Sequence, residues 1–188
     1  MAEFFELKPD EGFEFLLGEG DGFRLFNLFR ENRCRQIGER WAPLTIEVIS
    51  VNRRRVLKSG DFLICFWSAL FFRESVLSVL GKVLELEGEV LPFSSDKGEQ
   101  LYFLNPLLCD CLVASGEYPD KVVPSGLPGK WHAWCQFDEA KCRGRHVFMV
   151  PQLWPRTFVS RSFVDLVQAS GLTGARFDPV APEAITER

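Results

Sequence analysis

The stretch Thr157–Val180, TFVSRSFVDLVQASGLTGARFDPV, predicts a strand, a capped helix and a second strand. Ser160 can cap the helix by accepting a hydrogen bond from a free amide of its first turn, and Ser162 offers a competing start. Gly171 stands where a left-handed residue would end the helix, and Gly174 opens the turn into the next strand. An apolar stripe at helical spacing is formed by Phe163, Leu166 and Val167. The segment therefore predicts an amphipathic helix packed on a sheet.

A second helix-and-strand block lies upstream of this one. Asp61–Ile64 leads into Phe72–Leu80, which predicts a helix, and Glu87–Phe93 follows as a strand. Tyr102–Leu112 then combines a strand containing a tyrosine, an aliphatic residue and an asparagine with a Cys-Asp-Cys-Leu run. These segments are ordinary structural residues, with no catalytic motif among them.

The order of these segments resembles immunity protein family 11 of bacterial polymorphic toxin systems, formerly a domain of unknown function. Phe-Val-Ser, an apolar helix, Ala-Ser-Gly-Leu-Thr-Gly, an aromatic residue and Asp-Pro-Val are similar to its closing signature. The upstream block looks like the family's other helix-and-strand block, so the resemblance covers roughly residues 60–180. It implies a binding protein, encoded beside a toxin, that protects the cell by contacting the toxin's effector domain. Catalysis is not required for such a role.

The two blocks also resemble each other. Residues 75–80 align with residues 162–167 as serine-started helices, and each helix is followed after a glycine by a short strand with a proline. Chance competes with so short a repeat. If the repeat is real, it predicts two helix-strand units packed on a shared sheet, because a solenoid would need several repeats.

Length and composition predict one domain of the α+β class. A chain of 188 residues with 46% hydrophobic residues can bury a core without disulfides. We expect a single domain over residues 1–188, with a variable β-rich part at 1–58, a family-like core at 59–182 and a tail at 183–188. The expected architecture is a mostly antiparallel sheet with two or three helices packed on one face.

Local patterns place the elements of this domain. Short apolar runs predict strands at the amino end, namely Phe13–Leu17, Phe23–Phe29, Leu44–Val51 and Asp61–Ile64. Helices are predicted at about 70–84 and 161–170. Residues 115–130 contain three prolines and three glycines and predict a long surface loop, with strands at 131–134 and 147–150 on its carboxyl side.

Charge is distributed unevenly along the chain, whose formal net charge is −4. Residues 1–21 carry seven acids against one lysine, whereas residues 22–60 carry nine basic residues against three acids. Two solvated faces that partly neutralise each other explain this pattern. The acidic balance argues against nucleic-acid binding by Arg53–Arg55.

The amino terminus lacks a basic start followed by an apolar run, and the most apolar stretch, at 62–72, is too short to span a bilayer. We therefore expect a cytoplasmic protein that does not bind membranes. Its six cysteines are then expected to be reduced.

Two histidines and two cysteines within fifteen residues offer an alternative, a zinc- or thiol-dependent enzyme using His132, Cys135, Cys142 and His146. Their spacing is not that of a common zinc finger or ribbon. Cys109 and Cys111 alternate along a predicted strand, so their side chains point the same way, as buried cysteines acting as small apolar residues would.

The favoured expectation is a protein that is not an enzyme, uses no cofactor and binds a cognate toxin effector domain. The sequence contains none of the nucleophile, phosphate-loop, dinucleotide or metalloprotease motifs. Oligomeric state is left open. The candidate toxin-binding residues come from the predicted loop, its aromatic flanks and the acidic amino end: Glu117, Tyr118, Asp120, Trp131, Trp154, Asp10, Glu11 and Glu14.

Overall fold

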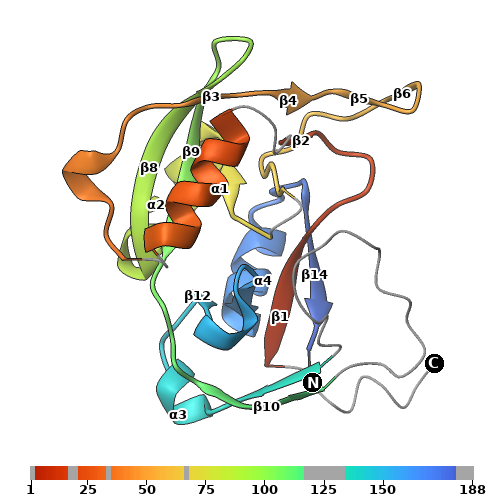
Figure 1. Ribbon diagram of the computed structural model, residues 1–188. Coiled ribbons are helices and arrows are strands. Elements are labelled where there is room, and N and C mark those ends of the chain that lie inside the picture. Colours follow the sequence, from red (N-terminus) through yellow and green to blue (C-terminus); the bar gives the residue numbers. More distant parts are fainter. Residues whose placement is uncertain (1–2, 17–20, 33–34, 66–67, 117–133, 181–188) are drawn as a thin grey trace.

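The computed structural model describes residues 3–16, 21–32, 35–65, 68–116 and 134–180 (Figure 1). Its described part is α+β, as the sequence predicts, and contains two four-stranded sheets with helices packed against them. Three smaller two-stranded ribbons complete the strand pairings of this part.

The first sheet has the order β12-β13-β1-β14 and is antiparallel throughout. Its strands are β1 (Phe4–Pro9), β12 (Val147–Met149), β13 (Thr157–Ser160) and β14 (Ala175–Pro179). The amino-terminal strand β1 lies between β13 and β14, so the closing block is a βαβ unit split by a strand from the other end of the chain. The amino-terminal strand β1 therefore contributes directly to the sheet formed by the closing block.

The second sheet has the order β3-β8-β9-β7. Its strands are β3 (Thr45–Ile46), β7 (Phe71–Phe72), β8 (Gly88–Ser95) and β9 (Gln100–Pro106), and only β3 with β8 is parallel. The ribbons pair β2 (Phe15–Leu16) with β4 (Val48–Ile49), β5 (Val51–Asn52) with β6 (Arg55–Val56), and β10 (Leu112–Gly116) with β11 (Trp134–Phe137).

The helices are α1 (Asp21–Asn32), α2 (Glu74–Glu87), the single turn α3 (Glu139–Cys142) and α4 (Arg161–Ala169), with 3₁₀ turns at Gly38–Arg40 and Pro151–Leu153. In Figure 1, α1 and α2 lie beside β8 and β9, and α4 lies beside β1. Buried side chains of α2, including Val76, Leu80 and Leu84, share one hydrophobic cluster with Phe5 of β1 and Phe163 of α4. This cluster joins the two sheets through α2.

The closing block has the local structure that its sequence predicts. The Ser160 hydroxyl accepts a hydrogen bond from the Phe163 N–H at 3.3 Å, so Ser160 is the N-cap of α4. Gly171 follows the helix with φ +67°, and Leu172 packs back onto the core. The competing start at Ser162 is not used.

Two strand predictions at the amino end are wrong. Phe23–Phe29 lies inside α1, where Leu25 is buried and Leu28, three residues later, packs against the same cluster. This helical spacing overrides the strand preference of the aromatic residues. Asp61–Ile64 is not a strand either, although Phe62 makes an isolated bridge with Phe72.

The predicted shared sheet is also wrong. The upstream helix α2 leads into β8 of the second sheet, whereas α4 leads into β14 of the first. Strand partners decide this outcome, since β8 pairs with its hairpin neighbour β9 while β14 pairs with β1 from the opposite end of the chain.

Candidate functional site

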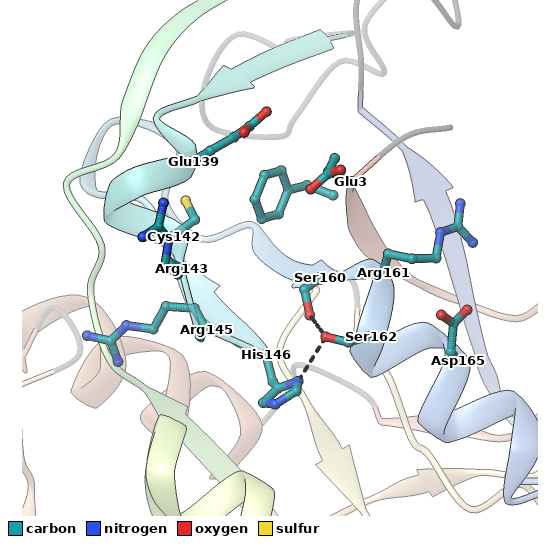
Figure 2. A pocket seen from close by; sticks show the side chains of 12 residues that line it. Glu3, Glu139, Cys142, Arg143, Arg145, His146, Ser160, Arg161, Ser162 and Asp165 are labelled. Atoms are coloured by element: carbon teal, nitrogen blue, oxygen red, sulfur yellow. Dashed lines mark hydrogen bonds between the residues drawn. The ribbon is translucent and has the colours of Figure 1, made fainter.

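The described residues form an open hollow between α3 and the beginning of α4, which we call the α3–α4 cleft (Figure 2). Its volume is about 750 Å³. Three segments distant in sequence line it: Glu3, Phe4, Glu139, Cys142, Arg143, Gly144, Arg145, His146, Ser160, Arg161, Ser162 and Asp165. The cleft therefore depends on the pairing of β1 and β12 with β13.

A buried carboxylate holds one wall of the cleft in place. Glu87, at the end of α2, is 2% exposed, and its Oε1 accepts a hydrogen bond from the His146 backbone N–H at 2.5 Å. Its other oxygen lies 3.7 Å from a guanidinium nitrogen of Arg145. These two contacts tie the buried carboxylate to the next segment, so Glu87 fixes the part of the chain that carries Arg145 and His146.

Hydroxyl groups and an imidazole form a short polar chain in the cleft. Ser160 Oγ and Ser162 Oγ are 2.9 Å apart, and Ser162 Oγ lies 3.3 Å from His146 Nδ1 (Figure 2). Within the described part of the chain, no hydrogen bond joins the imidazole ring of His146 to a side-chain carboxylate. A serine–histidine pair without an orienting acid lacks the third member of a catalytic triad.

The cleft carries both signs of charge in equal number. The acids are Glu3, Glu139 and Asp165, and the arginines are Arg143, Arg145 and Arg161. Figure 2 shows Arg143 and Arg145 on the α3 side, with Arg161 and Asp165 on the α4 side. Such a mixed surface suits the polar rim of a protein–protein interface better than a phosphate site, which would gather one sign.

The structure places four of the predicted contact residues away from this cleft. Trp154 is partly buried against the core, with its ring 5.2 Å from that of Phe26. Asp10 and Glu11 follow β1, and Glu11 is exposed. Glu117, Tyr118, Asp120 and Trp131 lie outside the described residues.

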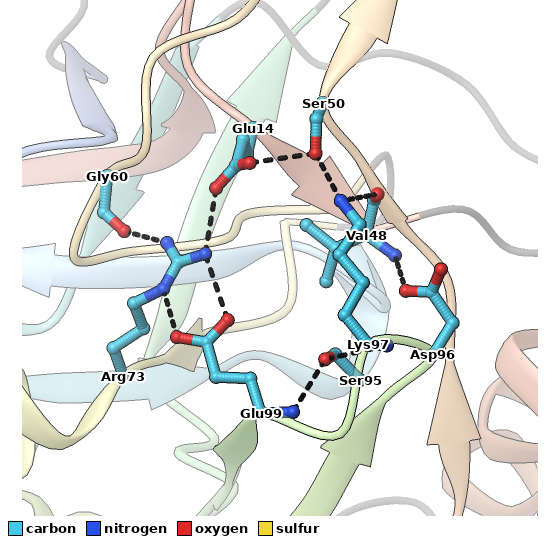
Figure 3. A network of polar contacts seen from close by, with 9 residues as sticks. All are labelled: Glu14, Val48, Ser50, Gly60, Arg73, Ser95, Asp96, Lys97 and Glu99. Carbon is cyan, nitrogen blue, oxygen red and sulfur yellow. Dashed lines mark hydrogen bonds and ion pairs between the residues drawn. The ribbon is translucent and has the colours of Figure 1, made fainter.

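Glu14, the fourth of these residues, belongs to an internal polar network (Figure 3). Its Oε2 lies 2.8 Å from Arg73, and its Oε1 accepts a hydrogen bond from Ser50 Oγ at 2.8 Å. Arg73 also donates to Glu99 at 2.6 Å and to the Gly60 carbonyl oxygen. Both Glu14 oxygens therefore have partners inside the protein, which leaves this carboxylate poorly suited to a toxin contact.

The alternative zinc ligands do not come together among the described residues. Cys135 Sγ lies 3.9 Å from Arg156, His146 faces Ser162, and Cys142 lies close to Cys109 and Cys111 instead. His132 is outside the described part. Burial raises the pKa of Cys135 and of Cys142, each to about 11. A nucleophilic cysteine needs a lowered pKa, so both thiols have the opposite character.

Sequence reasoning missed most of the cleft. Arg143 and Arg145 carry no local signal, and Ser162 indicates only a possible helix start, because the proximity of these residues depends on long-range strand pairing. The approach of Cys142 to the Cys-Asp-Cys run likewise depends on long-range contacts that the sequence does not indicate.

Comparison with protein-family models finds none that matches the chain, and none of the curated proteins matches it either. Within the described ranges, the helices are all too short or too polar to cross a membrane.

Proposed function

We propose that this protein is an immunity protein that binds a cognate bacterial toxin effector domain and neutralises it by direct stoichiometric contact. The observation that carries the proposal is the resemblance of residues 60–180 to immunity protein family 11. In that stretch the closing signature forms β13, α4 and β14, with Ser160 as the cap and Gly171 and Gly174 at positive φ.

The α3–α4 cleft supports the proposal as a contact surface. It is open to solvent, and it combines three acids and three arginines with the Ser160 and Ser162 hydroxyls. Charges at a rim that complement those of a partner accelerate encounter and penalise wrong partners, which suits an inhibitor that must find one toxin. The raised thiol pKa values and the incomplete serine–histidine pair weigh against an enzymatic role for the same region.

Two surfaces compete as the toxin-binding site, and single substitutions can separate them. Arg143, on the rim of the cleft, is exposed, and Tyr118 is the aromatic candidate of the predicted loop. If the cleft makes the contact, Arg143→Glu should weaken toxin binding at least about tenfold, the size of effect expected for reversing a charge at an interface. If the loop makes it, Tyr118→Ala should cause the larger loss.

The decisive experiment mixes the purified protein with the effector domain encoded beside its gene. Calorimetry gives the dissociation constant, and growth rescue in a heterologous host gives neutralisation. The control is Lys82→Glu, the same reversal of charge at an exposed position on α2, outside the cleft. Absence of binding to a folded and lethal toxin domain would refute the proposal.

A further inference from the structure

Three buried thiols converge at one point beside the α3–α4 cleft. Cys109 and Cys111 follow β9, Cys142 ends α3, and their three Sγ atoms all lie within 4.8 Å of one another. Their exposed fractions are 6%, 1% and 3%. We call this group the cysteine triangle.

Backbone hydrogen bonds hold the two segments of the triangle together. The Cys109 N–H donates to the Met149 carbonyl oxygen at 2.8 Å, and the Cys111 carbonyl oxygen accepts from the Asp138 N–H at 2.8 Å. Asp138 is also the N-cap of α3, and its carbonyl oxygen accepts from the Cys142 N–H at 3.1 Å. The three side chains are therefore positioned by the fold before any ligand arrives.

The ordinary explanation of a buried cysteine, a small apolar residue, does not account for this convergence. Cys135 belongs to the same hydrophobic cluster, yet its sulfur lies beside Arg156 and, among the described residues, joins no group of thiols. A disulfide would use two members of the triangle and leave the third unexplained. A metal ion uses all three at once.

The size of the triangle fits a metal that prefers thiolates. Zinc–sulfur bonds of about 2.3 Å in tetrahedral geometry place sulfur atoms about 3.8 Å apart. The thiols are already within 4.8 Å of each other, so small side-chain adjustments would bring them to that spacing. Thiolate ligands select zinc and other soft ions over magnesium or calcium.

The charge around the cysteine triangle and its access from solvent also suit a bound zinc ion. A zinc ion with three thiolates carries a net charge of −1, and the Lys141 ammonium donates to the carbonyl oxygen of Asp110, between the first two cysteines, at 2.9 Å. Cys142 lines the α3–α4 cleft, which gives an ion and a fourth ligand a route from solvent. Thiols bind zinc as thiolates, so binding must release protons and should strengthen as pH rises.

We propose that Cys109, Cys111 and Cys142 bind one zinc ion through their sulfur atoms. The ion would tie α3 and the wall of the cleft to the segment that follows β9. This site differs from the His132, Cys135, Cys142 and His146 set and does not depend on toxin binding.

The test uses the reduced full-length protein, stripped with a chelator and then titrated with zinc or cobalt alone. One equivalent of zinc by native mass spectrometry, a cobalt spectrum with thiolate charge-transfer bands, and a zinc-dependent rise in melting temperature are expected. Cys111→Ala should abolish all three, whereas Cys135→Ala, an equally buried cysteine outside the triangle, should keep them.

Thiol labelling of the wild-type protein keeps the test valid if Cys111→Ala fails to fold. Zinc should protect Cys109, Cys111 and Cys142 from alkylation, as mapped by peptide mass spectrometry, and leave labelling of Cys135 unchanged. Failure to bind either metal, a disulfide within the triangle in place of metal binding, or protection that does not include these three residues would overturn the proposal.

Discussion

The two helix-and-strand blocks, α2–β8 and α4–β14, have a similar order of residues but are held in place by different means. Ser160 caps α4 through its side chain, and α4 ends at Gly171 with φ +67°. Arg73 precedes α2 without a side-chain cap, and α2 runs directly into β8 at Gly88. The closing block is thus defined by local signals and the upstream block by tertiary contacts.

The serines at the second position of the two helices also differ in their contacts. Ser75 of α2 donates to Asp61 Oδ1 at 2.6 Å, whereas Ser162 of α4 contacts Ser160 and His146 in the cleft. Aligned residues therefore have different partners. A repeat in sequence order does not imply a repeat in interactions, because the two blocks belong to different sheets.

The largest effect is expected from a substitution that disrupts the junction between α2 and β8. A Cβ atom at Gly88 would lie 2.9 Å from the Asn105 carbonyl carbon and still closer to its oxygen, on the paired strand β9. Because these are backbone atoms, Gly88→Ala should lower the free energy of unfolding by about 3 kcal/mol or more. Denaturant unfolding measures this loss.

Gly81, inside α2, provides the matched control for Gly88 in the same helix-and-strand block. Its nearest neighbour for an added Cβ is Leu77 Cδ1 at 3.4 Å, an ordinary contact. Gly81→Ala should therefore stabilise α2 by about 0.5–1 kcal/mol through helix propensity. A loss at Gly81 as large as that at Gly88 would contradict the steric explanation.

The closing block could be predicted from its sequence because its determinants lie within one helix length of each other. The Ser160 cap and Gly171 act locally, and the structure confirms both. The predicted apolar stripe is only partly right, because Phe163 and Val167 are buried whereas Leu166 is exposed and Val164 is buried in its place. The α+β class followed in the same way from short strand and helix patterns. These features need no knowledge of distant contacts.

The remaining features of the fold and of the candidate site depend on contacts between segments that are distant in sequence. Nothing near β13 indicates that β1 separates it from β14, and the helical spacing in α1 competes with strong strand propensity. The α3–α4 cleft and the cysteine triangle likewise combine segments brought together by those pairings. Side chains of Arg143 and Cys142 acquire their neighbours only after the sheets form.

The next prediction concerns Asp61, which links the two blocks. Its carboxylate accepts hydrogen bonds from Ser75 Oγ near the start of α2, and from the Thr173 N–H and hydroxyl, at 2.8 and 2.9 Å, just before β14. Asp61→Asn should lower the free energy of unfolding by about 1–2 kcal/mol, since the charge that strengthens these bonds is lost.

The pH dependence of Asp61 gives an independent measurement. Burial by itself raises the pKa of Asp61, but the hydrogen bonds from Ser75 and Thr173 outweigh it and lower the pKa below its usual value. The stabilisation is then complete above the unfolded-state pKa, about 3.9, and is lost as pH falls through the folded-state value. Below about pH 4, unfolding of Asp61→Asn should vary less with pH than that of the wild type. Parallel curves would show that Asp61 does not link the blocks electrostatically.

Removing the cap of α4 tests the local character of the closing block. Ser160→Ala leaves the Phe163 N–H without its side-chain acceptor and should cost about 1 kcal/mol in unfolding free energy. Ser160→Asp should restore most of this loss, because aspartate is also a good cap. An unchanged stability in Ser160→Ala would mean that tertiary packing alone positions α4.

The smallest change in stability is expected from substitutions of the aligned serines Ser75 and Ser162, and it should differ between them. Ser75→Ala removes a hydrogen bond to a carboxylate and should cost about 1 kcal/mol, reduced by the exposure of the pair. Ser162→Ala removes hydroxyl contacts with Ser160 and His146 at an exposed position and should change the unfolding free energy by less than about 0.5 kcal/mol. Ser162 faces the α3–α4 cleft, so its substitution should instead affect toxin affinity if that cleft is the interface. Equal stability losses in the two variants would mean that the repeat extends to interactions as well as to sequence.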